Sequence, residues 1–124
     1  MCGFTGFITF NQQFTEQDLH SMTDCIAHRG PDSAGFFFNQ ICGLGHRRLS
    51  ILDLSEAANQ PFYSANGRYV MVYNGEVYNF QEIAQKLNVP LKTTSDTEVI
   101  IEAFVKWGPD FCAGIERHVR NCHL

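Results

Sequence analysis

The order of extended and helical patterns along this chain predicts an α+β fold. Segments rich in aromatic and β-branched residues occur early and again near the middle, and amphipathic helical patterns lie between and after them. The composition, 44% hydrophobic and 18% charged, is typical of a chain that buries a core. A length of 124 residues fits one domain of ordinary size.

Strands are predicted where β-branched and aromatic residues dominate short segments. In the first half these are Gly3–Phe10, Gly35–Phe38 and Ile41–His46, with a short turn at Asn39-Gln40 between the last two. Residues 48–54 fit either a further strand or an ordered loop. In the second half, Tyr69–Tyr73 is the clearest strand, and Asn74-Gly75 follows it directly.

Three helices are predicted from apolar spacing and from their end signals. They are expected to start after Thr15, Asn79 and Ser95, and to end before His28, Asn88 and Gly108. Two of the starts have the pattern of a capping box, Thr15 with Asp18 and Ser95 with Glu98, in which side chain and backbone bond reciprocally across the first turn.

Charge and hydropathy exclude several classes of partner. The net charge of −4 gives no basic footprint for nucleic acid or for an anionic membrane. No apolar run approaches the roughly 20 residues of a membrane helix, and no secretory signal is recognisable. The expected compartment is therefore the cytoplasm. The five cysteines are expected to be reduced thiols, with Cys25 and Cys42 as small core residues.

Cys2 has a chemical context that the other cysteines lack. If Met1 is cleaved, residue 2 carries both a thiol and a free α-amine, whose pKa near roughly 7.7–8.0 leaves a useful unprotonated fraction at neutral pH. The amine can then act as general base for its own side chain, directly or through a water. Thiolate attack on a carboxamide would give an acyl-enzyme and release ammonia. A Cys after the initiator Met is usually accidental, so the rest of the sequence must support this interpretation.

Six motifs occur in the order found in class II glutamine amidotransferases, which are N-terminal-nucleophile hydrolases. The chain resembles most the glutaminase domain of the asparagine synthetase family. The motifs are Met1-Cys2-Gly3, His28-Arg29-Gly30-Pro31-Asp32-Ser33, Gly45-His46-Arg47-Arg48-Leu49-Ser50-Ile51, Asn59-Gln60-Pro61, Tyr73-Asn74-Gly75-Glu76 and Ser95-Asp96-Thr97-Glu98. The resemblance implies the N-terminal part of an αββα sandwich, incomplete in this chain.

The resemblance also implies a role for each site residue. Cys2 would be the nucleophile, and Asn74 with Gly75 the oxyanion hole, although Asn-Gly after a strand is also a hairpin signal. Arg48 would bind the glutamine α-carboxylate and Asp96 its α-ammonium; alone, they would be a surface charge and a first-turn helix acid. The remaining substrate contacts are expected from Leu49, Ser50, Ile51, Leu52 and Glu76. The loop containing His28, Arg29 and Asp32 is expected to be structural.

L-glutamine is the implied substrate, and its hydrolysis to glutamate and ammonia would need no cofactor and no metal. In full-length relatives the ammonia would serve the ATP-dependent amidation of aspartate, with ATP and magnesium in a synthetase domain that this chain lacks. A homodimer is one assembly that the resemblance leaves open. Two alternatives remain: a sibling amidotransferase with another ammonia acceptor, and an inactive truncated remnant.

The sequence after Asp110 departs from the family pattern, so residues 1–110 are interpreted as a partial amidotransferase domain and residues 111–124 as a divergent tail. Cys112, His118, Cys122 and His123 match no zinc-ligand spacing. A back-translation of residues 111–124, with synonymous codons chosen for the test, reads Phe-Val-Gln-Glu-Leu-Asn-Gly-Met-Phe-Ala-Ile-Ala-Ile when shifted by one base. That is the expected family segment, which favours a frameshift or a sequencing error. Sequencing the DNA across the Phe111 codon tests this hypothesis, and an intact frame with no such alternative reading would contradict it.

Overall fold

The computed structural model describes residues 2–11, 13–50, 55–115 and 117–118, the last two by their backbone only. Its regular elements are β1 (Gly3–Ile8), α1 (Glu16–Cys25), β2 (Ser33–Phe38), β3 (Cys42–Arg48), β4 (Phe62–Tyr63), β5 (Val70–Met71), β6 (Glu76–Val77), α2 (Phe80–Leu87), α3 (Asp96–Trp107) and β7 (Arg117–His118). Short 3-10 segments cover Ala27–Arg29, Glu56–Ala58 and Gly108–Gly114. The mixture of helix and sheet agrees with the predicted α+β class.

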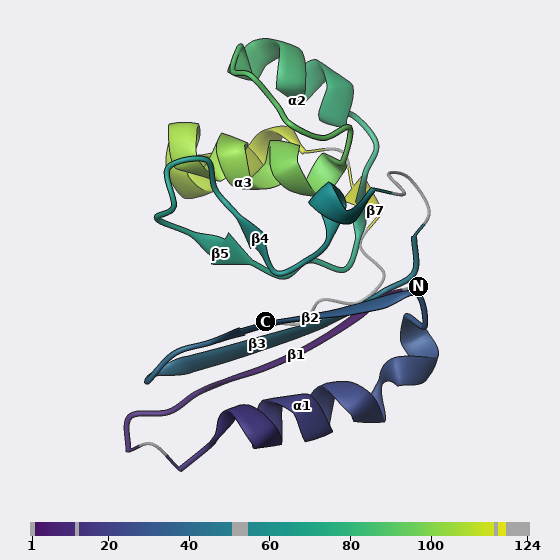
Figure 1. Cartoon of the computed structure of the whole chain (residues 1–124). Helices are drawn as coiled ribbons and strands as arrows, with labels where there is room; N and C mark the ends of the chain where they lie inside the picture. Colours follow the sequence, from purple (N-terminus) through teal and green to yellow (C-terminus); the bar gives the residue numbers. More distant parts are fainter. Residues whose placement is uncertain (1, 12, 51–54, 116, 119–124) are drawn as a thin grey trace.

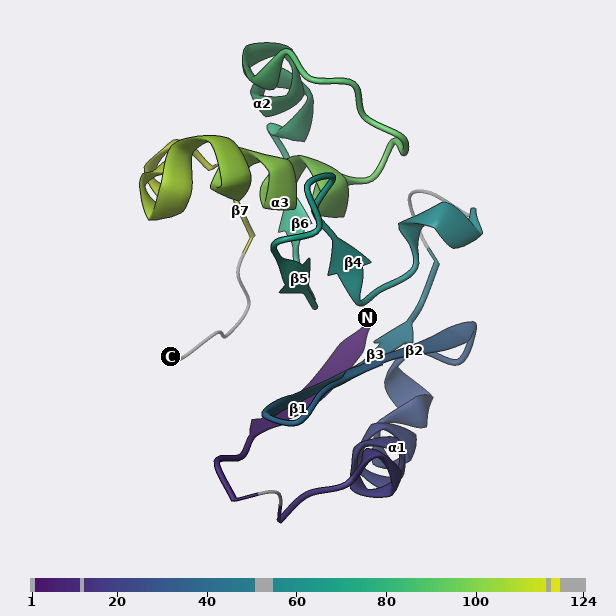
Figure 2. The same ribbon diagram turned by 60° about the vertical axis from the view of Figure 1, so that its left-hand side comes forward.

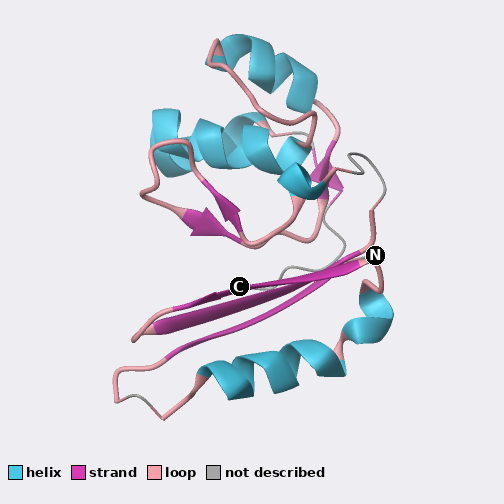
Figure 3. Cartoon of the chain, in the orientation of Figure 1, coloured by secondary structure: helices cyan, strands magenta, loops and turns pink. Residues whose placement is uncertain are grey.

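The elements are stacked in layers (Figures 1 and 3). Helix α1 covers one face of the sheet formed by β1, β3 and β2. The hairpin of β4 and β5 lies above the opposite face, and α3 and α2 lie beyond it. The turned view keeps this order and shows the N-terminal end of β1 on the side of the sheet next to β4 (Figure 2). The N-terminal residues therefore lie where the two sheet layers meet.

The three-stranded sheet is antiparallel in the order β1-β3-β2, and its register pairs Gly3 with Arg47 and Ser33 with Arg48. Helix α1 packs closely on it because Gly45 has no side chain. A Cβ at Gly45 would lie 2.0 Å from the Thr23 Oγ1 atom. Thr23 in turn shares a 2.7 Å hydrogen bond with Thr5, and Leu19 beside it is fully buried. This packing fixes the ends of β1 and β3 relative to each other.

A second core lies under α2 and α3. Its buried members come from β6 and the two helices, where apolar residues recur at helical spacing: Val77, Ile83, Leu87, Val99, Ile100 and Ala103. Phe111 and Ile115 are partly buried against the same cluster. The segment just after Asp110 thus packs on the helical layer, and β7 pairs with β6.

The predicted helix starts are correct, but one capping box differs. Thr15 and Asp18 form both bonds of the predicted box. Ser95 caps α3 by accepting from the Thr97 N–H at 3.0 Å, while the Glu98 carboxylate accepts from the Lys92 and Thr93 backbone instead of closing the box. The preceding loop folds over Glu98, so its carboxylate meets those N–H groups first.

Two further expectations need correction. The predicted Tyr69–Tyr73 strand is regular only at Val70–Met71, because the following segment leaves the hairpin and turns toward Asn74. Cys25 is exposed and Cys42 only half-buried, so the prediction that both are core residues is wrong. Cys25 is the last residue of α1. None of the described helices is long and apolar enough to cross a membrane.

Candidate active site

Cys2 lies immediately before β1, beside the end of β3. The antiparallel register that pairs Gly3 with Arg47 brings residue 2 next to the Arg48-Leu49 backbone. The Leu49 N–H donates to Cys2 Sγ at 3.3 Å, and the thiol lies 3.5 Å from the Leu49 carbonyl oxygen. The residue is half-buried. The thiol is therefore anchored on the backbone that directly follows β3.

Arg48 is the last residue of β3 and is only 8% exposed. Its Nη1 donates to the Ser55 carbonyl at 2.9 Å and to Asn59 Oδ1 at 2.7 Å. Asn59 Oδ1 also accepts from Ser33 Oγ at 3.2 Å, so the amide is fixed from β2 as well. These contacts hold the guanidinium on Ser55 and Asn59, while the register places the Arg48 backbone next to residue 2.

The loop before β2 secures the segment that follows Arg48. Asp32 Oδ2 accepts from the Ser50 N–H at 2.8 Å, and the Asp32 N–H donates to the Arg48 carbonyl at 3.1 Å. Gly30 permits this approach, since a Cβ there would lie 2.4 Å from the Arg47 carbonyl carbon. The geometry supports the expected structural role of this loop. Of the expected pocket backbone, Leu49 and Ser50 are placed, and Ile51 and Leu52 lie outside the described residues.

Asn74, Gly75 and Glu76 form the connection from β5 into β6. Asn74 is half-buried, whereas Gly75 and Glu76 are exposed. The Tyr73 ring lies against Gly75, where a Cβ would come within 2.5 Å of the Tyr73 Oη atom. The Tyr73 N–H donates to the Gln60 side-chain oxygen. Gly75 and Glu76 therefore lie at the surface, while Tyr73 before them is bound to Gln60.

Asp96 begins α3 and connects that helix to the same turn. Its Oδ2 accepts from the Val77 N–H at 3.0 Å, and the residue is 6% exposed. Burial raises the pKa of Asp96; the Val77 and Thr97 N–H groups oppose this, and the Glu76 charge adds to it. A buried carboxylate with a raised pKa is favourably placed to accept a cationic group of a ligand.

The chain matches a family model described as a glutamine amidotransferase domain over residues 1–116. It belongs to the glutamine amidotransferase domain family. The sequence prediction of this family is thus confirmed. The family is an enzyme family, and the roles of Cys2, Arg48, Asn74, Gly75 and Asp96 within it stay predictions from the motifs.

Relatives of this amidotransferase domain carry it at one end of longer proteins. The chain is 39% identical to putative asparagine synthetase (glutamine-hydrolyzing) 2 of Methanocaldococcus jannaschii, covering 89% of the chain and 25% of that protein. It is 40% identical to asparagine synthetase (glutamine-hydrolyzing) 2 of Bacillus subtilis, and this match covers 90% of the chain and 15% of that protein. It is 37% identical to amidase chry2 of Gibberella zeae, and this match covers 90% of the chain and 19% of that protein. The chain thus spans a quarter or less of these relatives.

His46 belongs to the motif that contains Arg48, and its burial is visible only in the structure. It precedes Arg48 by two residues on β3, so both side chains lie on the face opposite α1. It is 1% exposed, and neither ring nitrogen has a hydrogen-bond partner among the described residues. Burial lowers the pKa of His46 to about 4; the nearby Tyr73 backbone opposes this shift and the Arg48 charge adds to it.

The amidotransferase domain should lose stability in acid because of His46. Its pKa is about 4 when folded against an ordinary 6.5, so the unfolded chain binds the extra proton first as the pH falls. The contribution of His46 to the free energy of unfolding is therefore complete above pH 6.5. Toward pH 4 the free energy of unfolding decreases by about 2–3 kcal/mol. Urea unfolding at several pH values measures the step. His46→Gln should remove it, and His28→Gln, at an exposed site, should retain it. An unchanged pH dependence in His46→Gln would contradict this assignment.

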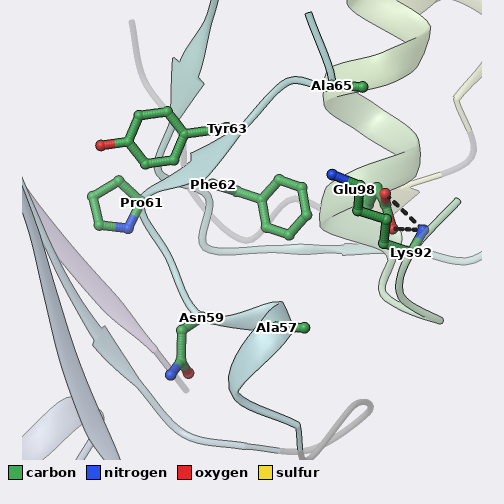
Figure 4. A pocket seen from close by; sticks show the side chains of 8 residues that line it. All are labelled: Ala57, Asn59, Pro61, Phe62, Tyr63, Ala65, Lys92 and Glu98. Carbon is green, nitrogen blue, oxygen red and sulfur yellow. Dashed lines mark hydrogen bonds between the residues drawn. The ribbon is translucent and has the colours of Figure 1, made fainter. Parts of the chain in front are cut away.

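A pocket of about 220 Å³ lies between the segment of residues 57–65 and the side chains of Lys92 and Glu98 (Figure 4). Its walls combine apolar groups with Lys92 and Glu98; the lining residues are Ala57, Asn59, Pro61, Phe62, Tyr63, Ala65, Lys92 and Glu98. Glu98 Oε1 and Oε2 accept from the Lys92 N–H at 2.9 and 3.0 Å, so this carboxylate is already occupied by the fold. Cys2 is not among the lining residues, and the pocket is separate from the thiol. No cluster suited to a metal ion occurs among the described residues.

Proposed function

We propose that this domain hydrolyses L-glutamine to glutamate and ammonia, with Cys2 as the nucleophile. The observation that carries the proposal is the position of the thiol. It accepts from the Leu49 N–H at 3.3 Å, and Leu49 directly follows the buried Arg48 along the chain. Nucleophile and carboxylate-binding group therefore lie on adjacent paired strands. We include in the proposal that the layered fold is the N-terminal part of an αββα N-terminal-nucleophile hydrolase sandwich.

The reaction needs a base, and the α-amine of Cys2 supplies it once Met1 is removed. The amine takes the thiol proton, and the thiolate attacks the carbonyl carbon of the glutamine side-chain amide. The negative oxygen of the tetrahedral intermediate is met by the Asn74 side-chain amide and the Gly75 N–H. The C–N bond then breaks, the proton returns to the leaving nitrogen, and ammonia departs. Water attacks the remaining thioester, which releases glutamate and restores the thiol.

Substrate orientation follows from the two charged groups. Arg48 binds the glutamine α-carboxylate through its planar fork of donors, and Asp96 binds the α-ammonium. Glu76 and the backbone of Leu49 and Ser50 complete the contacts, together with Ile51 and Leu52. Because the α-carbon groups are held at one end, the side-chain amide is directed toward Cys2.

Asp96→Asn should stabilise the fold and weaken substrate binding. Burial raises the pKa of Asp96, so its charged form costs more in the folded chain than in the unfolded chain at neutral pH. An asparagine oxygen can still accept from the Val77 N–H. Loss of the charged partner of the α-ammonium should raise KM about 10- to 100-fold. Asp110→Asn, at an exposed carboxylate, is the control. A lowered melting temperature with unchanged KM would contradict both arguments.

In full-length relatives we propose that the ammonia supports ATP-dependent amidation of aspartate, with ATP and magnesium bound outside this domain and the reaction placed in the cytoplasm. One observation favours a second acceptor. Identity to an amidase, 37%, is nearly the same as the 39% to an asparagine synthetase. Ammonia release is common to both candidates, so the first assay should measure hydrolysis and not asparagine.

The test uses the chain with Met1 removed, which intact mass spectrometry verifies. The purified protein is incubated with L-glutamine, and glutamate and ammonia are measured together. Equimolar release of both is the expected result. A folded, processed chain that produces neither would refute hydrolysis and favour the inactive remnant. D-glutamine and L-asparagine, which alter the α-carbon geometry and the side-chain length, serve as control substrates that should react far more slowly.

A further inference from the structure

Gln60 is the middle residue of the Asn59-Gln60-Pro61 motif. Gln60 is 9% exposed, and both polar atoms of its side chain are used. Its Oε1 accepts from the Tyr73 N–H, and its Nε2 lies 3.4 Å from Thr97 Oγ1. One buried amide therefore connects the segment before β6 with the first turn of α3.

Both of its partners are direct neighbours of site residues. Tyr73 immediately precedes Asn74-Gly75, and its ring rests on Gly75. Thr97 immediately follows Asp96. The hydrogen bond from the Tyr73 N–H to Gln60 thus fixes the backbone directly before Asn74 and Gly75. Since Gly75 is exposed and Asn74 only half-buried, this bond restrains a segment that has little packing of its own.

The backbone of the same motif is seated on the three-stranded sheet. A Cβ at Gly35 would lie 2.0 Å from the Gln60 carbonyl oxygen, so the motif lies directly on β2. The adjacent Asn59 side chain holds Arg48 on β3 at 2.7 Å. Asn59 therefore contacts Arg48, and the next residue, Gln60, contacts the segment that leads into Asn74. The distance between the two sides is fixed through residues 59 and 60.

We propose that Gln60 is a positioning residue for the oxyanion hole, acting through its bond to the Tyr73 N–H. This inference rests on the proposed glutamine hydrolysis. A residue that only filled the core would affect stability and the folded fraction. A residue that sets the position of Asn74 and Gly75 affects kcat, because the oxyanion contacts are made in the transition state.

Gln60→Met tests the inference, because it keeps the length of the side chain and removes both hydrogen bonds. We expect kcat to decrease about 10- to 100-fold, as a displacement of about 1 Å can cost, with KM changing less than about threefold. Gln60→Glu is the rescue variant: it retains an acceptor for the Tyr73 N–H, and should recover most of kcat despite a lower melting temperature. Gln85→Met, at an exposed position on α2, is the matched control and should resemble the wild type.

A second readout is independent of turnover. Hydrogen exchange at the Tyr73 amide should be faster in Gln60→Met than in wild type, and slow again in Gln60→Glu. Unchanged kcat and unchanged exchange in Gln60→Met would overturn the inference while leaving the proposed hydrolysis intact. If the wild type itself releases no glutamate, the proposed function fails. Tyr73 exchange and the Asn74 and Gly75 amide chemical shifts then still decide whether Gln60 positions the turn.

Discussion

Replacement of Cys2 by alanine should abolish release of glutamate from glutamine, with a loss of kcat on the order of 10⁴-fold or more. No other described thiol lies against the Leu49 N–H, and the acyl-enzyme cannot form without sulfur at this position. Folding should change little. The residue is half-buried and precedes β1, so the variant loses one contact worth about 1 kcal/mol.

The controls for Cys2 separate the nucleophile from general thiol reactivity. Cys112→Ala removes an exposed thiol and should leave hydrolysis unchanged. Cys2→Ser retains the amine and a hydroxyl, which is a weaker nucleophile, and should keep only a trace of activity. Mass spectrometry after brief alkylation should find Cys2 modified and protected by added glutamine. Full activity in Cys2→Ala would refute the assignment of the nucleophile, whatever the other variants do.

Replacement of Asn74 by alanine should lower kcat by about 10²- to 10³-fold, equivalent to about 2.7–4 kcal/mol of transition-state stabilisation. KM should change much less, because the side-chain amide acts mainly on the developing oxyanion and not on the bound glutamine. Steady-state kinetics over a range of glutamine concentrations measures both constants. The half-buried position of Asn74 in a turn makes a large loss of stability from this change unexpected.

Asn74→Asp is the closely matched variant, because it keeps the shape of the side chain and replaces the donor by a negative group. It should be at least as inactive as Asn74→Ala, since a carboxylate repels the oxyanion. Alkylation of Cys2 should remain fast in both variants, which separates loss of the oxyanion donor from damage to the nucleophile. Equal decreases in alkylation and in turnover would instead indicate that the turn supports Cys2 itself.

Local signals in the sequence were sufficient for the helices and for most strands. The Thr15 capping box, the apolar face of α1 and the Gly108-Pro109 end of α3 depend on residues within one or two turns, so they are recognisable without tertiary information. The short strands β4, β6 and β7 were not predicted. Two-residue strands exist only because a distant segment offers pairing partners, and no local pattern encodes that.

The same division applies to the site. The sequence alone determined the family, and it predicts Cys2, Arg48, Asn74, Gly75 and Asp96 as site residues because each belongs to a short motif of fixed spacing. Only the tertiary structure placed the thiol on the Leu49 N–H and joined the Asn74 turn to Asp96 through Val77. It alone also identified His46 and Gln60. His46 is distinguished by its burial and Gln60 by partners far apart along the chain, and both features arise only when the layers pack.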